Sequence, residues 1–394
     1  MYHLRGKEAK SSVKFFHLAD LHIGKNVNGF SMLRDQRHVL EQVLAAAERE
    51  RPEALLLAGD IYDRPVPAGE AVALLDWFLT ELAALNLPCL AVAGNHDSGV
   101  RLSFAGQLLR RNGVYLAGTV QEELLHVPFH RDGVTAVVWL LPFLRPAEVA
   151  ALFPEEEVHS YDDAVRVVLA HQKLQPNRCN LLVAHQFVTQ GGREPERSDS
   201  EAISVGGVDN VDSAVFAGFD YVALGHLHGP QSVGEHCHYA GSPLQYSFSE
   251  LHHRKGITVV QVEDGKQITL SRIPLEPLHP LREIQGPLEA LLKGEIVAQG
   301  DPEDYLHVTL TDELEPENAQ TRLRAVYPNL MKLDFDNSRT RQEELRLRTD
   351  TEEKMPSLEE LFAEFYQRQN GRELDEQSKA LVGETLDAEG GEML

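Results

Sequence analysis

The sequence predicts an α/β fold, followed by a small second domain and a polar tail. Between residues 13 and 274, short apolar runs alternate with polar clusters and helical stretches, and this alternation is typical of layered α/β proteins. After Leu275 the composition changes, becoming proline-rich and then strongly charged. We therefore expect a main domain over residues 13–275, a small α+β domain over 276–340 and a helical tail over 341–394.

Length and composition agree with several folded domains. The chain has 394 residues, of which 42% are hydrophobic and 25% charged, so it can bury a sizeable core. Its net charge of −24 excludes nonspecific nucleic-acid binding through overall charge, but it is compatible with phosphate binding through metal ions. The three cysteines lack C-x-x-C spacing, which argues against a disulfide framework or zinc ribbon and for a reducing compartment. No apolar run approaches the roughly 18 residues of a membrane span.

The predicted strands begin after a short polar leader. Residues 1–12 are basic and contain no apolar segment, so they lack the pattern of a signal peptide, and we interpret them as a leader or tag. From Val13 onward, runs rich in Val, Leu and Ala have the length and composition of buried strands. These runs are Lys14–Ala19, Ala54–Ala58, Cys89–Ala93, Ala136–Leu141, Leu181–Ala184 and Tyr221–Leu224.

Helical patterns and one hairpin complete the main domain. After the first strand, Ser31 can cap a helix that carries an apolar stripe from Leu40 to Ala47. A second helix is expected from about Gly69 to Leu85. Near the end of the main domain, the dipeptide Asp264-Gly265 separates two strand-like runs, which predicts a hairpin with a type I′ turn.

The region after Leu275 predicts a small β-α-β unit. A proline-punctuated linker or domain entry comes first. Hydrophobic residues then alternate over 306–310 and 331–335, with a helix near Pro316–Val326 between them. The acidic tail contains one apolar stripe with helical spacing, and because so short a tail offers it no partner, we expect it to dock on another protein. The stripe consists of Leu358, Leu361, Phe362, Phe365 and Tyr366.

Polar clusters directly follow five of the predicted strands. Open α/β sheets usually bind ligands at the carboxyl ends of their strands, so we expect these clusters to meet at one edge. In chain order they are Asp20-Leu21-His22, Gly59-Asp60-Ile61-Tyr62-Asp63, Gly94-Asn95-His96-Asp97, Ala184-His185 and Gly225-His226-Leu227-His228.

The residue types in these clusters predict a metal centre. In an extended chain, residues i and i+2 point to one face, so Asp20 and His22 can reach one point, as can His226 and His228. Carboxylate, imidazole and amide ligands together suit a divalent cation such as Mn, Fe or Zn, and the absence of cysteine ligands argues against structural zinc. Six or seven such ligands exceed the needs of one ion. We therefore expect two metals about 3.5–4 Å apart that share a carboxylate and act on a phosphate ester.

Taken alone, each cluster has an ordinary structural interpretation. A D-x-H string occurs by chance, and a single buried histidine is usually a hydrogen-bonded core residue. All five clusters in this order, each at the end of a strand, are far more specific. Their order resembles the signature of the calcineurin-like metallophosphoesterases, over roughly Val13 to Pro274. The resemblance implies two β-sheets packed face to face and flanked by helices.

The same resemblance implies roles for individual residues. His96 would face the scissile phosphate, where it protonates the leaving oxygen or stabilises the transition state, and Asp97 would orient His96. One metal would be held by Asp20, His22, Asp60 and His228, and the second by Asp60 as a bridge, Asn95, His185 and His226.

Longer strings resemble the SbcD family of bacterial DNA nucleases. They include KFFHLADLHIGK and VAGNHDSGVRLSFAG in the main domain, YPNLMKLDF in the second domain and MPSLEELFAEFYQRQNGRELDEQ in the tail. This resemblance implies a Mn²⁺-dependent nuclease, with Mg²⁺ as the alternative metal. It would act as a 3′–5′ exonuclease on duplex DNA ends and as an endonuclease on hairpins and single strands, in DNA repair and recombination.

The same family resemblance implies partners and a location. The second domain would be a capping domain, and the C-terminal helices would dock on the coiled coil of SbcC, an ATP-binding-cassette ATPase. A homodimer within a heterotetramer, located in the cytoplasm at the nucleoid, is expected on the same ground.

Several polar residues beside the clusters have open roles. Asp63 stands where some relatives carry a DNA-contacting histidine, and its role stays open. The loop Gly191–Asp209 is long enough to flank the site, whereas His236 and His238 are expected on a strand rather than at the metals. Five further residues either hold DNA phosphates or brace their loops: Lys25, Asn26, Arg64, Ser98 and Arg101.

Two other functions fit parts of the pattern. A phosphoprotein or small-molecule phosphoesterase would use the same two-metal site, and Asp60–Arg64 faintly resembles the phosphatase string G-D-x-V-D-R-G. Pro65, GNHD in place of GNHE and the segments after residue 275 disfavour it. A scaffold with a vestigial metal site is disfavoured because no ligand is missing.

Overall fold

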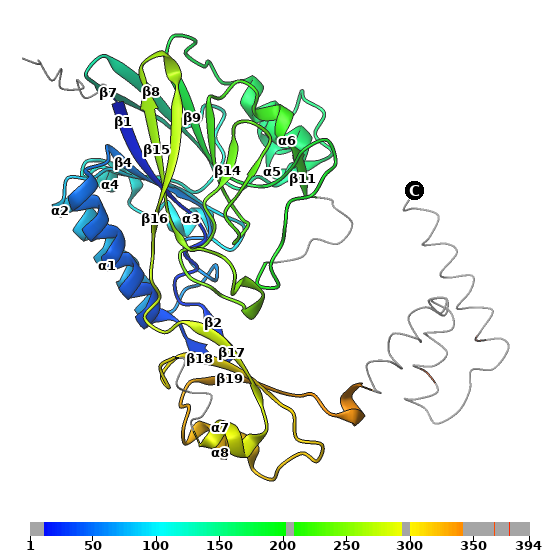
Figure 1. Ribbon diagram of the computed structural model, residues 1–394. Helices are drawn as coiled ribbons and strands as arrows, with labels where there is room; N and C mark the ends of the chain where they lie inside the picture. The colour runs from blue at the N-terminus through cyan, green and yellow to red at the C-terminus, as the bar shows by residue number, and fades with distance from the viewer. Residues whose placement is uncertain (1–11, 202–208, 294–299, 342–365, 367–377, 379–394) are drawn as a thin grey trace, which may run out of the picture.

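The computed structural model describes residues 12–201, 209–293 and 300–341, together with Tyr366 and Ser378. Residues 1–11 of the expected leader, nearly all of the expected helical tail, and its apolar stripe apart from Tyr366 lie outside the described residues. The described chain forms two six-stranded sheets, one three-stranded sheet and two short ribbons (Figure 1). None of its helices is both long and apolar enough to cross a bilayer.

The first large sheet has the N-terminal strand in its middle. β1 pairs parallel with β4 and antiparallel with β15. β4 is buried along its whole length, which explains its continuous apolar run. In spatial order the strands are β16 (Ile268–Pro274), β15 (Gly256–Glu263), β1 (Ser12–Leu18), β4 (Ala54–Ala58), β5 (Cys89–Val92) and β6 (Val114–Ala117).

The second large sheet is parallel at its centre and antiparallel at its edges. β8, β9, β12 and β14 run parallel, whereas β7 and β13 pair antiparallel with their neighbours. In spatial order the strands are β13 (Gln231–Val233), β14 (Cys237–Tyr239), β12 (Tyr221–Gly225), β9 (Cys179–His185), β8 (Val134–Leu141) and β7 (His126–Arg131). The short ribbons are β2 (Asn26–Val27) with β3 (Phe30–Ser31), and β10 (Phe187–Thr189) with β11 (Asn210–Asp212).

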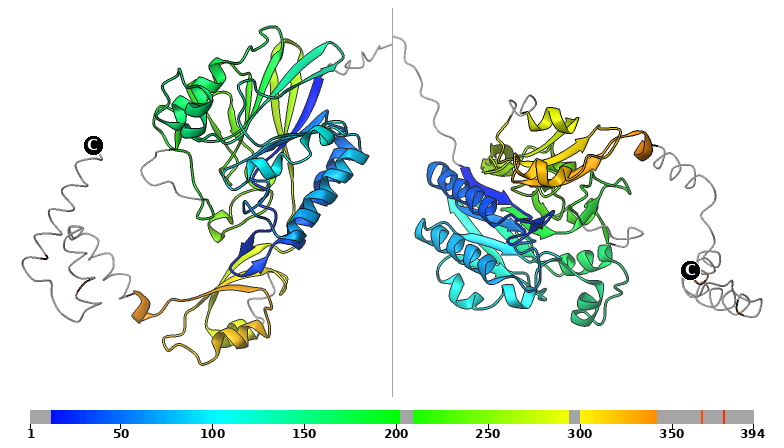
Figure 2. Two further views of the ribbon diagram at one scale, coloured as in Figure 1. Left: turned by 180° about the vertical axis from the view of Figure 1, so that it is seen from behind. Right: turned by 90° about the horizontal axis from the view of Figure 1, so that it is seen from below.

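The two large sheets pack face to face between layers of helices. Along β1, Phe15 enters the core between the sheets, and Phe16 enters the core under the helices, because successive side chains of a strand alternate in direction. α1 and α2 lie side by side on the first sheet, and α5 and α6 cover the second (Figure 2). This arrangement confirms the predicted two-sheet α/β fold. The helices are α1 (Leu33–Glu50), α2 (Gly69–Ala84), α3 (Gly99–Leu102), α4 (Gly106–Arg110), α5 (Pro146–Leu152) and α6 (Tyr161–Ala170).

Two predicted element ends were wrong. Ser31 lies in β3, and the N-cap of α1 is Met32, which makes no side-chain capping bond. The Met32 side chain is only 1% exposed, and its burial holds the start of α1 in place instead. The hairpin between β15 and β16 is present. Its turn, however, consists of three residues, Asp264–Lys266, of which Gly265 and Lys266 have positive φ. A type I′ hairpin loop has only two residues.

Residues after 275 form a three-stranded parallel sheet with two helices at the lower end of the molecule in Figure 1. The elements are β17 (Leu281–Gly286), α7 (Leu288–Leu292), β18 (Tyr305–Leu310), α8 (Ala319–Arg324) and β19 (Leu330–Phe335). β18, α8 and β19 match the predicted β-α-β unit. β17 and α7 were not predicted, because the proline-punctuated segment was interpreted as a linker or domain entry.

A buried contact joins this third sheet to the start of α1. The Tyr305 hydroxyl donates to Oδ2 of Asp35 at 2.8 Å, and the backbone N–H of His279 donates to Oδ1 at 3.0 Å. Met32 and Met331 belong to one apolar cluster that spans the same boundary. The third sheet is therefore docked on the segment that leads from β1 into α1.

Candidate metal centre

The five polar clusters meet where strands of both large sheets end. Each predicted ligand lies at the carboxyl end of its strand or in the loop that follows. Most of these side chains are buried; Asn95, His96 and His226 are partly exposed. In chain order, Asp20 and His22 follow β1, Asp60 follows β4, Asn95 and His96 follow β5, His185 ends β9, and His226 and His228 follow β12.

The backbone that presents these ligands is not extended, which corrects the predicted i, i+2 geometry. Asp20 and His22 have φ of 54° and 44°, and Asp60 and His226 also have positive φ, at 48° and 107°. The N–H of His22 donates to the carbonyl of Asp60 at 2.9 Å, which ties the loop after β1 to the loop after β4. Positive φ at non-glycine residues costs on the order of 1 kcal/mol or more each and is typical of functional sites.

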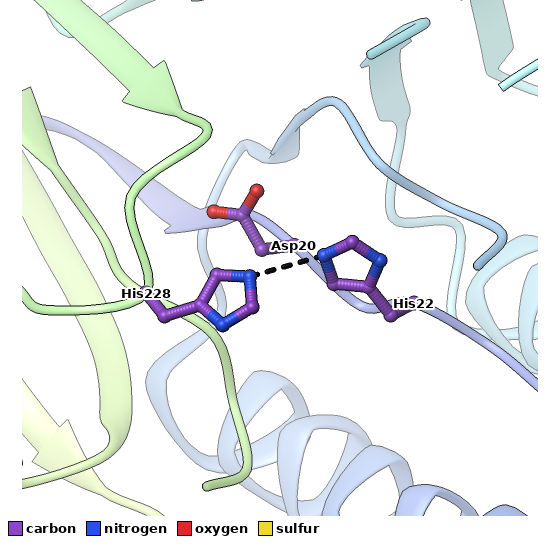
Figure 3. A group of neighbouring side chains, drawn as sticks. All are labelled: Asp20, His22 and His228. Carbon is purple, nitrogen blue, oxygen red and sulfur yellow. Dashed lines mark hydrogen bonds between the residues drawn. The ribbon is translucent and has the colours of Figure 1, made fainter. Parts of the chain in front are cut away.

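Asp20, His22 and His228 form the first candidate metal group (Figure 3). The Nε2 atoms of His22 and His228 lie 3.1 Å apart. Oδ2 of Asp20 and Nδ1 of His22 are buried without a hydrogen-bond partner among the described residues. Because buried polar atoms rarely stay unpaired, the orphaned Asp20 oxygen and the facing imidazole nitrogens fit a bound cation. Nδ1 of His22 lies on the other side of its ring, 3.6 Å from Oδ1 of Asp63.

Asp60 lies between the first group and a second one. Its Oδ2 is 3.6 Å from Nε2 of His22 and 3.5 Å from Nε2 of His185. On the far side, Oδ1 of Asn95 lies 3.0 Å from Nε2 of His185 and 3.2 Å from Nδ1 of His226. The structure thus brings all seven predicted ligands into one continuous cluster, with Asp60 at the position that a bridging carboxylate needs.

Glycine is required in the loop that carries Asp60. Gly59 has a φ of +85°, and a Cβ there would lie 2.3 Å from Nδ1 of His185. That nitrogen lies 2.8 Å from the carbonyl oxygen of Ala58, to which it donates when it carries the ring proton. The close approach of the two loops therefore leaves Nε2 of His185 bare for a cation.

Burial sets the protonation of this cluster when no cation is bound. Burial raises the pKa of Asp20 well above its usual range and lowers the pKa of His226 to about 3. It also lowers the pKa of His22 well below its usual value. Although burial acts to raise the pKa of Asp60, the neighbouring His185 holds it well below its usual range. Although burial acts to lower it, the Asp60 carboxylate raises the pKa of His185 to about 9, so His185 is protonated beside an ionised Asp60. A divalent ion must therefore displace the protons of His185 and Asp20, because neutral imidazoles and ionised carboxylates are the forms that ligate it.

His96 lies at the rim of the cluster. Its Nε2 is 3.9 Å from Oδ2 of Asp60, and its side chain is 29% exposed. Its Nδ1 lies 3.0 Å from the backbone carbonyl oxygen of Asp63. His96 is therefore oriented with one ring nitrogen toward the cluster and the other held by the main chain.

Among the described residues, Asp97 makes no hydrogen bond to the His96 ring. The expectation that Asp97 orients this ring directly is therefore corrected. Oδ2 of Asp97 accepts the N–H groups of Ile61 and Gly94, and its Oδ1 accepts that of Tyr62, at 2.9–3.0 Å. The carboxylate thus joins the loop after β4 to the loop after β5, because three backbone donors converge on it.

Asp63 lies beside the cluster and forms ion pairs with two of the candidate DNA-binding side chains. Its carboxylate lies 2.9 Å from the Lys25 ammonium and 3.7 Å from the Arg64 guanidinium. Lys25 is 15% exposed, whereas Arg64 is 75% exposed and faces solvent. The other candidates lie on β2, just before α3 and within α3; they are Asn26, Ser98 and Arg101 respectively.

Two histidines outside the metal cluster have purely structural surroundings. Nδ1 of His17 lies 3.0 Å from the Tyr221 hydroxyl, and its Nε2 lies 3.2 Å from the carbonyl oxygen of Leu224. His238 lies on β14, as predicted, and stacks on the ring of Tyr221. His236, which was also expected on a strand, lies in the turn just before β14.

Sequence reasoning missed a buried polar group behind His228. Glu250 and Lys255 form a buried ion pair there, and Ser200 and Glu201 contact the same histidine. Burial acts to raise the pKa of Glu250, but its hydrogen bond with His228 and the Lys255 ammonium hold that pKa well below its usual range. No motif marks these residues, because tertiary contacts alone bring them together.

Two family models match the chain. The model for calcineurin-like phosphoesterases matches residues 13–230, and the SbcD_C model, described as the type 5 capsule protein repressor C-terminal domain, matches residues 277–370. The first covers the two large sheets as far as β12 and all seven predicted ligands. The second covers the three-stranded sheet.

Curated relatives extend the match along the chain. The SbcD component of the SbcCD nuclease of Staphylococcus epidermidis is 34% identical over 334 residues, covering 83% of this chain and 87% of that protein. The same component from Staphylococcus saprophyticus is 33% identical over 336 residues, with the same coverage. A dimetal phosphatase from Danio rerio aligns with 67% of this chain and 99% of its own at a TM-score of 0.35 and 14% identity. The chain therefore belongs to the calcineurin-like phosphoesterases and, within them, to the SbcD family of SbcCD nucleases.

Proposed function

We propose that this chain is a metal-dependent DNA nuclease that hydrolyses phosphodiester bonds at a two-metal centre. The observation that carries the proposal is the continuous cluster of seven ligands with Asp60 in its middle. When bound, a metal pair supplies an activated water and a positive field for the phosphate. One ion would be held by Asp20, His22, Asp60 and His228, and the other by Asp60, Asn95, His185 and His226.

We assign His96 to the leaving oxygen of the scissile phosphate. Its position at the rim of the cluster supports this role, as does the carbonyl of Asp63, which leaves Nε2 pointing toward Asp60. From there His96 donates a proton to the leaving oxygen or stabilises its charge. Asp97 contributes by holding together the loops that carry Asp60 and His96.

We propose Mn²⁺ as the metal, with Mg²⁺ as the alternative. Imidazole nitrogens supply four of the seven ligands. Mg²⁺ prefers oxygen ligands and keeps several waters, whereas nitrogen-rich sites favour transition metals. The donor set therefore supports Mn²⁺.

The proposed substrates are duplex DNA ends, cut 3′ to 5′, and hairpins and single strands, cut internally. Arg64 and the start of α3 supply exposed candidates for phosphate contacts. We further propose residues 13–275 as the nuclease domain, 276–340 as a capping domain, and 341–394 as a tail that binds an SbcC-like ATPase. A homodimer within a heterotetramer at the bacterial nucleoid completes this proposal, which the family membership supports.

The proposal is tested by incubating the purified chain with Mn²⁺ or Mg²⁺ and end-labelled blunt duplex or hairpin DNA. We expect Mn²⁺-dependent cleavage that falls by about 100-fold or more in His96→Ala and is abolished in Asp60→Ala. His130→Ala, at an exposed position on β7, should leave the rate unchanged.

A simple aryl phosphodiester serves as the second substrate in this assay. Turnover of the ester with DNA left intact, even after addition of the ATPase partner, would contradict the nuclease proposal. Such a result would favour a small-molecule or phosphoprotein phosphoesterase at the same site.

A further inference from the structure

The two ring nitrogens of His228 have different surroundings. Nε2 faces the metal cluster, 3.1 Å from Nε2 of His22. Nδ1 faces a buried polar network, 2.7 Å from Oγ of Ser200 and 3.3 Å from Oε1 of Glu250. His228 and Glu250 are both almost completely inaccessible to solvent, so water cannot replace these contacts.

The network determines which nitrogen carries the proton. Oγ of Ser200 lies 2.5 Å from Oε1 of Glu250. An ionised carboxylate only accepts, so the hydroxyl donates its one proton to Glu250. Both atoms that approach Nδ1 of His228 are therefore acceptors. Nδ1 must carry the ring proton, and a neutral imidazole then has a bare Nε2, the form that ligates a cation.

Lys255 holds this arrangement in place. Its ammonium donates to Oε2 of Glu250 at 2.5 Å, to Oγ of Ser242 at 2.8 Å and to the backbone carbonyl of His228 at 2.9 Å. All three of its donors are used, and its charge compensates a carboxylate that would be costly to bury alone. The Lys255 ammonium thus holds both the Glu250 carboxylate and the main chain of His228.

We propose that Glu250, held by Lys255, is the positioning residue for His228. It keeps the imidazole in the tautomer and orientation that direct Nε2 toward the metal, both directly and through Ser200, the nearer acceptor of the Nδ1 proton, whose hydroxyl it orients. This inference rests on the two-metal site proposed above and extends it to residues outside the ligand motifs. Carboxylate partners of metal-ligating histidines typically change metal affinity by about 10–100-fold when they are replaced.

The test is Glu250→Gln in the full chain. Glutamine keeps the size of the side chain, but its amide has only one acceptor atom. Either Lys255 or the Nδ1 proton of His228 must then face an NH₂ group. We expect wild type to bind two Mn²⁺ ions, and Glu250→Gln to bind one of them about 10–100-fold more weakly. Calorimetric titration measures the affinities, and electron paramagnetic resonance distinguishes a coupled pair from isolated Mn²⁺.

A matched control comes from a buried ion pair remote from the site. Asp304 is 5% exposed and accepts from Arg282 at 2.6 Å in the three-stranded sheet. Asp304→Asn removes the charge of a buried, paired carboxylate in the same way, but it should leave both Mn²⁺ affinities and the coupled signal unchanged. Melting of each metal-free variant, followed by circular dichroism, reports whether it folds.

If Glu250→Gln does not fold, Ser200→Ala decides, because Ser200 is only half-buried and its loss removes one acceptor of the Nδ1 proton. We expect about a tenfold loss at one Mn²⁺ site. Two ions bound at wild-type affinity with a coupled signal in Glu250→Gln would overturn the role of Glu250, and the same result in Ser200→Ala would overturn the hydrogen-bonded network at Nδ1 through which Glu250 is proposed to act. If wild type itself binds no Mn²⁺ pair, the proposed function fails, and this outcome is distinguishable because it appears without any substitution.

Discussion

At the scale of single residues, the loops of the candidate centre depend on buried acceptors. Asp97 receives three backbone N–H groups from the loops after β4 and β5. His17 fills a comparable position between the sheets, where the Tyr221 hydroxyl and a backbone carbonyl satisfy its two nitrogens. Each of these side chains links two chain segments, so a change of its chemistry should affect the stability of the whole domain.

Asp97→Asn should destabilise the fold. An amide NH₂ would face at least one backbone N–H that now donates to a carboxylate oxygen. We expect the free energy of unfolding to fall by about 2 kcal/mol, measured by urea denaturation in the presence of a chelator. Asp132→Asn, on an exposed turn, should change it by less than about 0.5 kcal/mol. Equal midpoints for the two variants would contradict the role of Asp97 as a loop connector.

His17 should make the fold sensitive to acid. Burial lowers the pKa of His17 from 6.5 to about 3, so below pH 6.5 the unfolded chain binds a proton that the folded chain does not. Its contribution to stability is therefore lost as the pH falls from 6.5 toward 3, by up to about 1.4 kcal/mol per pH unit. In His17→Gln, urea denaturation between pH 6.5 and 5 should show a shallower loss than wild type. If stability fell equally with pH in His17→Gln and in wild type, a group other than His17 would be responsible for the acid sensitivity.

At the scale of elements, the loop after β4 and the end of β9 approach so closely that a side chain at Gly59 would collide with His185. Gly133, in the turn between β7 and β8, has nearly the same φ, +86° against +85°, and no atom within 4 Å of its hypothetical Cβ. The two glycines therefore separate the cost of backbone conformation from the cost of the contact.

Gly133→Ala should cost about 1–2 kcal/mol, because its backbone conformation is unfavourable for alanine. Gly59→Ala carries this cost and also displaces His185, so it should destabilise the chain further and weaken Mn²⁺ binding. Urea denaturation and Mn²⁺ titration of both variants measure these effects. The account of the loop would be wrong if Gly59→Ala bound Mn²⁺ as tightly as Gly133→Ala.

The central strands could be predicted from sequence, because strands buried on both faces are continuous apolar runs. β17 could not, since Leu281 and Ile284 are its only buried large apolar residues, and charged or polar side chains separate them. The ligands were predictable because they are metal-binding residue types directly after strands. The left-handed backbone of these ligands could not be predicted. Nor could the role of Glu250, because it lies 22 positions from His228 in the chain and contacts it only in the folded structure.

At the scale of the whole molecule, the start of α1 connects the third sheet to the metal cluster. Asp35 accepts from Tyr305 of β18, and the next residue, Gln36, donates to the carbonyl of His22 at 2.7 Å. One helical turn thus contacts both parts. Any substrate that touches the third sheet and the cluster together meets surfaces that are fixed relative to each other.

The net charge predicts that the isolated chain binds duplex DNA weakly. At −24, the isolated chain should repel duplex DNA except at the metals and a few exposed arginines. We expect weak affinity that falls steeply with salt, and tighter binding once an ATPase partner supplies basic surface. Fluorescence anisotropy with labelled duplex at several salt concentrations measures this. A tight, salt-insensitive complex of the isolated chain would contradict it.

The central claim is that seven side chains from both large sheets form one centre for two metals. The most direct measurement is anomalous diffraction at the manganese edge, from crystals grown with Mn²⁺. The account predicts two peaks about 3.5–4 Å apart on either side of the Asp60 carboxylate, one beside His22 and His228 and the other beside His185 and His226. A single peak, or two peaks that do not share Asp60, would contradict the account.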